Sequence, residues 1–422
     1  MSKFAMFWVV ALLGSVSTAN AYRSLSFEVD TETYNPTFSE WSSENSTFVY
    51  YSLCEWNFQR DAEPKECIVN RLQNDFSGTS PKEDRCNVKL HPQSGGSIDT
   101  FYVNIARMGE DRAILSWMEL TDNDHWEYEY DLRFSIVNFS NCNVKTASLP
   151  RGLDLKNIIP YYATSYSHNE LSNGIYLEET DDLDVFFFNS MSIDKYSINT
   201  EGIVSKVDNS RLTYPLDFPV KEGTGMLMFP LSEDKGYLFM EIAHEISNDV
   251  GVTMALIQPN GQRRNLTHYI TPNFSKLSLD NGLIGVCTKN YTTLKCTQFK
   301  PDDEEINWFA TSLIAEPYTL HSMYNLPRGE GFLIFTPFDI DDKHVTPSGK
   351  KLVKIGLDGK AKQYVNTNMG CERRSEMYEK IFKDGQGNYC VSFECEQKVE
   401  FEDRFVTKFQ SKCFAPNDFT DI

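Results

Sequence analysis

Short apolar runs alternate with polar turn clusters along this chain, most regularly between Gly225 and Arg263. In that stretch the apolar runs are Met226–Phe229, Tyr237–Ile242 and Val252–Ile257. Clusters of Ser, Glu, Asp, Asn, Lys and Gly separate them, and the last run is followed by Pro-Asn-Gly, a sequence that favours a tight turn. Short apolar runs bounded by turn formers predict β-strands, and no window here has the helical period.

Looser copies of this unit recur from one end of the chain to the other. Each copy holds short apolar runs and closes on a cluster of Asn, Asp, Pro or Gly, so that seven units of about 40 to 60 residues follow one another. The runs outside the opening stretch are Thr47–Leu53, Cys67–Val69, Phe101–Ile105, Ala113–Trp117, Tyr130–Val137, Gly174–Leu177, Asp184–Phe188, Tyr196–Ile198, Leu283–Cys287, Leu294–Phe299, Trp308–Phe309, Gly331–Phe335, Leu352–Leu357, Tyr389–Phe393, Val399–Phe401 and Phe405–Phe409.

This repetition predicts an all-β fold, a single β-propeller domain over residues 22–422 built from four-stranded blades. We expect seven blades, with six as the alternative. The strand at Ser24–Val29 is expected to complete the last blade, because closing the ring removes exposed strand edges. Two β-sandwich domains are the competing fold, since short strands with turn signals also allow them. The chain shows no Pro-, Gly- or Ser-rich linker and no change of composition midway, which favours the propeller.

The first 21 residues have the pattern of a secretory signal peptide. Lys3 precedes the apolar run Phe4–Leu13, and the segment ends in Ala-Asn-Ala at Ala21, a small-residue cleavage site. A retained membrane anchor is disfavoured, because a spanning helix needs about 20 apolar residues, and no other segment reaches that length. We therefore expect a secreted, extracellular protein without a membrane span.

Net charge limits the partners. The whole chain carries 40 basic and 60 acidic residues, a formal charge of −20, and removal of Lys3 with the signal peptide makes it −21. A chain this acidic repels nucleic acid and anionic lipid at long range, so we expect no nucleic-acid partner. Its partner is expected to be an extracellular protein or a small ligand, neutral or cationic. The same charge is also explained by solubility alone.

The ten cysteines are an even number in a chain expected to be exported, which predicts disulfides. Local spacing favours Cys287 with Cys296 and Cys395 with Cys413, each pair flanking a turn, and leaves Cys54 with Cys67, Cys86 with Cys142, and Cys371 with Cys390 as the remaining predicted pairs. Spacing does not fix connectivity. A zinc site is disfavoured, because there is no C-x-x-C and no His at ligand spacing beside a Cys.

Five N-x-S/T sequons are candidate glycosylation sites, which fits an exported protein. Their asparagines are Asn45, Asn138, Asn265, Asn273 and Asn290.

Motifs for known catalytic chemistry are missing from the sequence, and we predict no catalytic residue and no cofactor-binding residue. There is no G-x-S-x-G elbow, phosphate-binding glycine loop or EF-hand, and His244-Glu245 lacks the second His of a zincin. Ser232–Phe239 fits S-x-D-x-G-x-x-[W/F], which resembles the Asp-box turn of sialidase-like propellers, and Ser278–Gly282 resembles its first half. The resemblance implies a propeller turn only, since no arginine cluster for a sialidase substrate can be assigned.

Three acidic loops are candidate Ca²⁺ sites, because alternate carboxylates in a loop can converge on one ion. The candidate ligands are Asp122 and Asp124 in one loop and Asp339 and Asp341 in another, and Asp181–Asp184 forms the third loop. The alternative is a solvated loop that keeps a strand edge from pairing. No other cofactor is predicted.

In layout the chain resembles secreted insect proteins of unknown function from hymenopteran venoms and from salivary or gut secretions. It is also similar in plan to the Yellow and royal-jelly propellers. The resemblance covers the whole chain and rests on size, repeat layout and signal peptide. It implies a venom or salivary factor, whereas the amine-binding role of Yellow-type proteins is not carried over, because their ligand residues match no positions here.

Two functions follow from these observations. The favoured one is a secreted, non-enzymatic binding protein that uses the loop face or the central cavity of the propeller, where variable loops converge. The alternative is a secreted, glycan-directed hydrolase that draws carboxylates from several blades. The hydrolase requires two or more carboxylates and an Arg, Tyr or His in one pocket.

Overall fold

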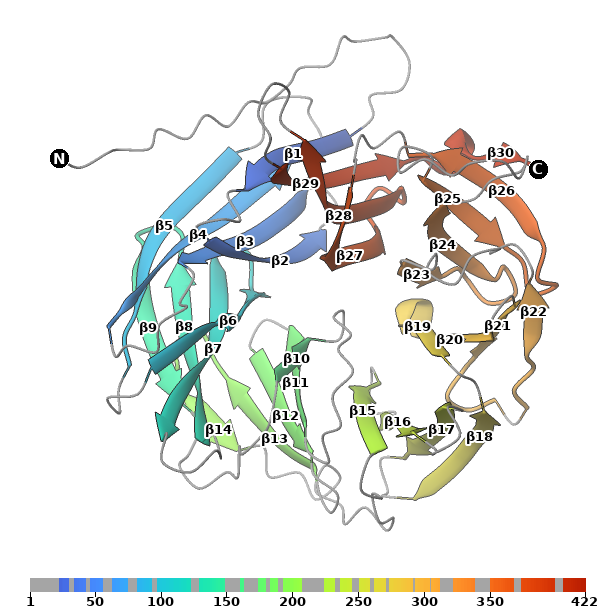
Figure 1. Ribbon diagram of the computed structural model, residues 1–422, viewed down its shortest axis with the longest axis horizontal. Helices are drawn as coiled ribbons and strands as arrows, with labels where there is room; N and C mark the ends of the chain where they lie inside the picture. Colours follow the sequence, from blue (N-terminus) through green and yellow to red (C-terminus); the bar gives the residue numbers. More distant parts are fainter. Residues whose placement is uncertain are drawn as a thin grey trace, which may run out of the picture.

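A computed structural model shows the chain as a ring of β-sheets (Figure 1). The structure describes residues 23–29, 34–42, 46–55, 63–74, 82–92, 97–122, 129–148, 160–162, 174–179, 183–188, 193–206, 224–231, 236–244, 250–258, 262–270, 273–290, 293–303, 305–311, 322–337, 350–367, 373–398 and 405–422. The described strands form seven sheets, five of four strands and two of five.

The first three sheets in chain order contain strands β2 to β14, and successive strands within each sheet are neighbours. Their bounds are β2 Tyr34–Ser42, β3 Thr47–Glu55, β4 Lys65–Asn74 and β5 Lys82–Leu90; β6 Ser97–Met108, β7 Arg112–Asp122, β8 Glu129–Asn138 and β9 Asn143–Ser148; and β10 Pro160–Tyr162, β11 Gly174–Glu179, β12 Leu183–Phe188, β13 Ile193–Ile198 and β14 Val204–Lys206. Only β10 pairs with its neighbour in parallel.

The next three sheets have the same antiparallel order, and a fifth strand, β30, pairs with β26 at the edge of the last of them. Their bounds are β15 Thr224–Pro230, β16 Tyr237–His244, β17 Val250–Ile257 and β18 Arg263–Ile270; β19 Asn273–Ser278, β20 Ile284–Asn290, β21 Thr293–Phe299 and β22 Phe309–Thr311; and β23 Ser322–Asn325, β24 Phe332–Pro337, β25 Lys350–Ile355, β26 Ala361–Asn366 and β30 Thr420–Asp421.

The seventh sheet joins the two ends of the chain. It consists of β27 Arg373–Lys383, β28 Tyr389–Lys398, β29 Phe405–Phe414 and the N-terminal strand β1 Arg23–Val29. β1 pairs antiparallel with β29, with Phe27 opposite Phe409. The predicted closure of the ring by the Ser24–Val29 strand is thus confirmed, and so is the propeller. Two β-sandwiches are excluded, because each four- or five-stranded sheet follows the last around one ring (Figure 1).

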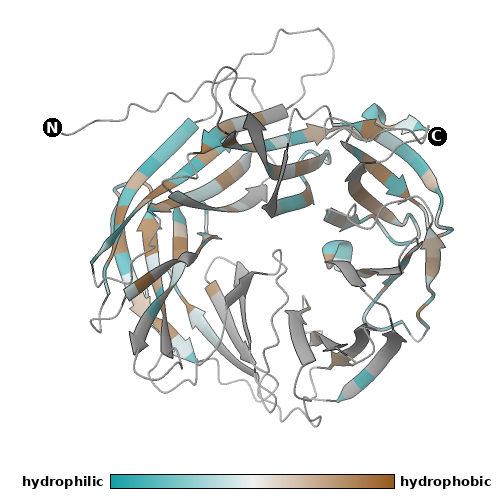
Figure 2. Cartoon of the chain, viewed as in Figure 1, coloured by the Kyte–Doolittle hydropathy of each residue, from teal (hydrophilic) through white to brown (hydrophobic). Residues whose placement is uncertain are grey.

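The core lies between neighbouring sheets. Phe27, Phe38, Tyr51 and Phe409 pack together where the seventh sheet meets the sheet of β2 to β5, with Phe27 stacked on Phe409 at a ring-centroid distance of 5.0 Å. Figure 2 shows hydrophobic and hydrophilic positions intermixed along the described strands. A strand that buries both faces between two sheets is mainly apolar on both, which explains the run Ala113–Trp117, where every residue is buried and Ser116 is the one polar residue.

Strands marked by an apolar run were predicted at the correct positions, and strands without such a run were missed. The runs Met226–Phe229, Tyr237–Ile242 and Val252–Ile257 coincide with β15, β16 and β17, but the sheet continues into β18, which the apolar pattern did not mark. The last strand of the first sheet, β5, alternates between exposed and buried residues from Arg85 to Leu90, and β9 has a single buried residue, Ala147. Strands β19, β23, β26 and β27 were also missed.

The turns that precede β9, β14 and β26 share one feature, a polar side chain that accepts hydrogen bonds from backbone N–H groups. The Asn199 Oδ1 accepts hydrogen bonds from the N–H groups of Glu201 and Ile203, both at 3.0 Å. Asn138 and Asp358 each bind an N–H two residues further on, at 2.8 and 3.1 Å. These turns are the Asn- and Asp-rich clusters that mark the sequence repeat, so the repeat has a structural cause.

Two short 3₁₀ helices, Asp280–Gly282 and Pro416–Asp418, are the helices among the described residues. Neither is long and apolar enough to cross a bilayer, and no other described helix exists that could.

Candidate functional site

Four disulfides are present among the described residues. Cys54–Cys67 and Cys287–Cys296 join cysteines that face each other on adjacent strands, and Cys86–Cys142 joins β5 to the turn after β8 in the neighbouring sheet. These three pairs confirm the prediction. Four disulfides are typical of proteins that fold in an oxidising compartment.

The fourth disulfide corrects two predicted pairs. Cys390 bonds Cys413, so neither Cys395–Cys413 nor Cys371–Cys390 forms. The cause is strand register, which places Cys390 opposite Cys413 and Cys395 opposite Lys408. Cys371 lies outside the described residues. Asp384 lies beside this disulfide, and the three side chains could surround an ion geometrically, but both sulfurs are consumed by the S–S bond and offer no thiolate.

Most of the other predicted sites cannot be placed. Of the Ca²⁺ candidates, Asp124, Asp339 and Asp341 lie outside the described residues, and Asp122 is the last residue of β7. These calcium sites remain a prediction. Among the sequons, Asn45 also lies outside the described residues. Asn265 lies within β18, Asn273 begins β19, Asn290 ends β20, and Asn138 ends β8, where it is half-buried. No observation tests their glycosylation.

The Asp-box-like segment Ser278–Gly282 forms a turn that fastens one sheet to the next. The Ser278 Oγ donates to the Asp280 Oδ2 at 2.5 Å and accepts the N–H of Asn325, the last residue of β23, at 2.8 Å. The Asn325 side-chain amide donates to the carbonyls of Ser278 and Leu283, both at 2.9 Å. Asn281 and Gly282 have φ of 58° and 65°, as a left-handed turn requires. In the other motif, Ser232–Lys235 lies outside the described residues.

The Asp280 carboxyl is the strongly perturbed acid of this turn. Burial raises its pKa to about 6, against the lowering effects of the Ser278 hydroxyl, the Lys380 charge and the Asn325 N–H. The neighbouring Tyr324 hydroxyl has its pKa raised to about 12, first by burial and then by the Asp280 charge. These groups connect sheets and are engaged with one another, so we assign the turn a structural role.

A pocket of about 460 Å³ lies between the sheet of β19 to β22 and the sheet of β23 to β26. We call it the Trp308 pocket. Its lining comes from the end of β21, the start of β22 and the segment between them, together with the turn between β23 and β24 and the turn between β25 and β26. The lining residues are Gln298, Asp303, Glu305, Asn307, Trp308, Phe309, Arg328, Gly329 and Leu357. The volume falls within the range of small-molecule sites, about 300–1,000 Å³.

Hydrogen bonds fix the polar groups on one side of the Trp308 pocket. The Gln298 Nε2 donates to the carbonyls of Leu326 and Gly331, at 3.1 and 2.8 Å, which holds its amide across the two sheets. The Asp303 Oδ1 accepts the Arg328 Nη2 at 2.9 Å, and its Oδ2 accepts the Lys300 N–H at 2.8 Å.

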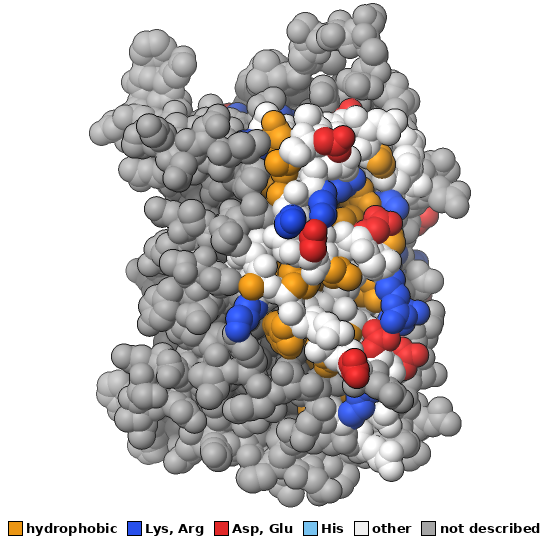
Figure 3. Space-filling model, turned by 90° about the vertical axis from the view of Figure 1, so that its right-hand side faces the viewer, with side chains coloured by type: hydrophobic (Ala, Val, Ile, Leu, Met, Phe, Trp, Pro, Cys, Tyr) orange, Lys and Arg blue, Asp and Glu red, His pale blue; other side chains and the backbone are white. Residues whose placement is uncertain are grey.

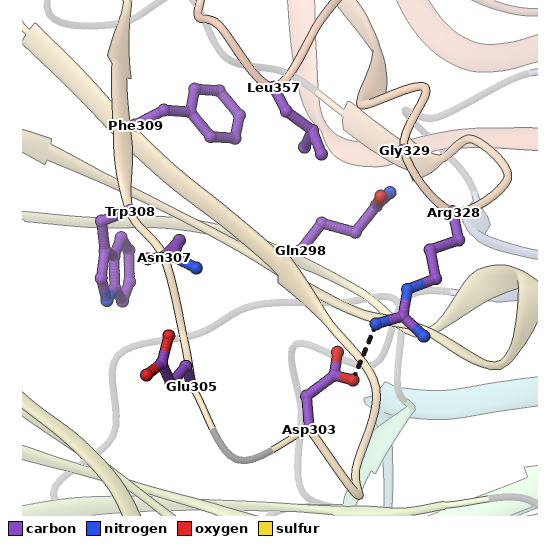
Figure 4. Close-up of a pocket in the computed structure, with 9 residues that line it drawn as sticks. All are labelled: Gln298, Asp303, Glu305, Asn307, Trp308, Phe309, Arg328, Gly329 and Leu357. Atoms are coloured by element: carbon purple, nitrogen blue, oxygen red, sulfur yellow. Dashed lines mark hydrogen bonds and ion pairs between the residues drawn. The ribbon is translucent and has the colours of Figure 1, made fainter.

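The pocket has an apolar end and a charged end. Figure 4 shows Phe309 and Leu357 together at one end, the Gln298 amide in the middle, and Asp303 with Arg328 at the other. Trp308 and Phe309 are half-buried, and Leu357 is 38 % exposed, an uncommon degree of exposure for a large apolar side chain in the described part of this chain. Such a site suits a ligand with one apolar face and several hydrogen-bonding groups.

This pocket was not predicted from the sequence. The predicted strand Trp308–Phe309 is correct for Phe309, which begins β22, but no site was assigned to it. Leu357 was placed at the end of an apolar run, and Arg328 drew no attention. The pocket depends on turns from two sheets meeting, which spacing along the chain does not show.

Other buried charges are structural. Arg71 donates to the Asp84 Oδ2 at 2.7 Å, and its guanidinium lies 5.2 Å from the centre of the Phe139 ring, between the first two sheets. In the same region the Arg133 Nε donates to the Glu119 Oε2 at 3.0 Å, with both side chains almost fully buried. These cations are paired with carboxylates, and Arg71 also packs on an aromatic ring, so we assign both ion pairs a structural role.

No protein-family model matches the sequence, and no curated protein does. Solved structures with a similar arrangement of strands include the NanB sialidase from Streptococcus pneumoniae, 12 % identical with a TM-score of 0.39, covering 96 % of this chain and 72 % of its own. An uncharacterised protein from Listeria monocytogenes is 10 % identical with a TM-score of 0.42, covering 87 % and 94 %. A mutant Trypanosoma rangeli sialidase is 8 % identical with a TM-score of 0.38, covering 94 % and 60 %. Identity this low transfers no ligand and no residue role to the chain.

Proposed function

We propose that this chain is a secreted, non-enzymatic binding protein whose ligand site is the Trp308 pocket. Export is supported by the signal-peptide pattern of residues 1–21 and by the four disulfides. The site is lined by turns and strand ends of two neighbouring sheets, whereas the sequence led us to expect the loop face or the central cavity. The observation that carries the proposal is the pocket itself, in which aromatic, amide and charged side chains converge.

Binding is favoured over hydrolysis by how the acidic groups are held. The pocket does contain two carboxylates and an arginine, the residue types that a glycan hydrolase requires. However, Asp303 uses both oxygens to accept hydrogen bonds from Arg328 and the Lys300 backbone. Glu305 is exposed to solvent, whereas a carboxylic acid that donates a proton at neutral pH is usually held in an apolar surrounding. Neither residue has the environment of a general acid.

Ligand-observed NMR on the secreted protein tests this function. The probes are a set of small molecules of different chemistry: methyl glycosides of neutral sugars, N-acetylneuraminic acid, tyramine and free amino acids. We expect saturation transfer to at least one of these classes in the wild-type protein and its loss in Trp308→Ala. A Glu63→Gln variant, altered at an exposed residue just before β4, is the control and should bind like the wild type.

Catalysis would appear in a parallel assay. If the protein releases 4-nitrophenol from nitrophenyl glycosides, and Glu305→Gln abolishes that release, the chain is a hydrolase and the proposal is wrong. Absence of binding to every probe class, or binding that Trp308→Ala leaves unchanged, would equally contradict it.

A further inference from the structure

We infer that the ligand of the Trp308 pocket is a neutral saccharide. The inference rests on the proposed function and gives that function a ligand class. It follows from the charge of the pocket, the placement of its hydrogen-bonding groups and its aromatic surface, taken in turn.

Charge disfavours an anionic ligand. Two carboxylates, Asp303 and Glu305, and a single guanidinium, Arg328, line the pocket, so its formal charge is −1. The Arg328 charge is already paired with Asp303 at 2.9 Å. Figure 3 shows acidic and basic side chains interspersed with apolar ones over the described part of the side of the ring that carries β22, so no basic surface there attracts an anion. A sugar acid would therefore bind less well than its neutral counterpart.

Charge alone does not select against a cation, because the pocket carries a formal charge of −1 and the Arg328 guanidinium is paired with Asp303. The hydrogen-bonding groups and the apolar end favour a saccharide over a simple amine.

Hydrogen-bonding capacity matches hydroxyl groups. Each hydroxyl both donates and accepts, so a ring with several hydroxyls needs donors and acceptors side by side. The pocket supplies carboxylate acceptors at Asp303 and Glu305, donors on the Arg328 fork, and amides at Gln298 and Asn307. Of the five N–H groups of a guanidinium, Asp303 takes one, so the fork retains donors. Because both Gln298 N–H bonds go to backbone carbonyls, its fixed oxygen serves as the acceptor.

The aromatic side supplies the remaining contact. A pyranose ring has a face of C–H groups that packs on an aromatic ring as other apolar groups do. Figure 4 shows Phe309 offering such a surface, with Leu357 beside it, and Trp308 is a further aromatic residue of the lining, placed on the other side of the strand. The pocket has an apolar end and a hydrogen-bonding end. A sugar suits such a site, because its C–H face and its hydroxyl groups point in different directions from the ring. The volume of about 460 Å³ leaves room for more than one sugar ring.

Titration calorimetry with methyl glycosides of glucose, galactose, mannose and fucose tests the inference on the intact, disulfide-bonded protein. We expect at least one of them to bind, and we expect N-acetylneuraminic acid and tyramine to bind at least about tenfold more weakly. Arg328→Ala and Trp308→Ala should each weaken binding at least about tenfold, the effect of losing one charged hydrogen bond or one aromatic contact.

Three controls separate the outcomes. The Glu63→Gln variant should keep wild-type affinity, and Arg328→Ala should keep the wild-type unfolding midpoint, because its ion pair is exposed and contributes little to stability. If tyramine or an amino acid binds through Trp308 and no glycoside does, the saccharide inference fails while the binding function stands. If no probe binds at all, both fail. Binding of a glycoside that neither pocket variant weakens would place the sugar elsewhere and would overturn the inference.

Discussion

The stability of the turn at Asp280 should depend on pH in a direction that follows from its burial. The pKa of this carboxyl is raised from its ordinary 3.8 to about 6, so the folded protein binds the proton more tightly than the unfolded chain does. Stability contributed by the protonated form is therefore complete below about pH 3.8 and is lost as the pH rises through about 6. A difference of this size corresponds to about 3 kcal/mol when the titration is complete.

Asp280→Asn is the perturbation that isolates this effect. The amide has the shape of the carboxyl and can still accept the Ser278 hydroxyl hydrogen bond, but it does not ionise. Guanidinium unfolding of both proteins between pH 4 and 7.5 should show the variant gaining about 2 to 3 kcal/mol relative to wild type as the pH rises, since the wild type alone bears the cost of a buried charge.

Asp358→Asn serves as the matched control. Asp358 is exposed, and its pKa is lowered by the hydrogen bond from Lys362 and the N–H of Lys360. The ionised Asp358 carboxylate stabilises the folded protein, and this stabilisation is lost as the pH falls. The Asp358→Asn variant should therefore not gain stability relative to wild type as the pH rises. A difference between Asp280→Asn and wild type that stays constant from pH 4 to 7.5 would refute the assignment of Asp280 as a buried acid with a raised pKa.

Three further predictions concern packing and covalent structure. Glu119→Gln should lower the free energy of unfolding by about 3–5 kcal/mol, as expected for breaking a buried ion pair with Arg133, and equal denaturation midpoints would show that the pair contributes little. Gly331→Ala should also destabilise the protein, because Gly331 has φ of 92° and a Cβ there would lie 2.0 Å from a backbone carbonyl of β25; a melting temperature within 1 °C of wild type, roughly the noise of the measurement, would contradict this. Mass spectrometry of non-reduced peptides should find Cys390 linked to Cys413, and a Cys395–Cys413 peptide in its place would show that the strand register is different.

Some features of the turns follow from nearby residues, and others depend on a neighbouring sheet. Clusters at Asn199 and Asp358 were identified in the sequence because Asn, Asp and Gly satisfy backbone groups within a few residues, and such contacts do not depend on distant parts of the chain. Their spacing was enough to predict a propeller. The contact between Ser278 and Asn325 could not be foreseen, because it joins residues from different sheets.

The same contrast between nearby and distant residues explains why some predicted disulfides are correct and others are wrong. Cys287 and Cys296 flank one short turn, so their pairing follows from local geometry. Cys390 and Cys395 both lie on β28, and only the register of β28 with β29 decides which of them lies opposite Cys413. A shift of register by a few residues leaves the composition of each strand unchanged and alters every cross-strand pair.

Residue types and short-range spacing were enough to predict the all-β class, the repeat and the strands that carry an apolar run. The folded arrangement settled the outer strands such as β9, whose polar residues become a strand by pairing with a neighbouring sheet edge rather than through an apolar pattern. It also decided the Trp308 pocket. Gln298 and Arg328 come from adjacent sheets, and their convergence depends on how the two sheets pack, which no local pattern encodes.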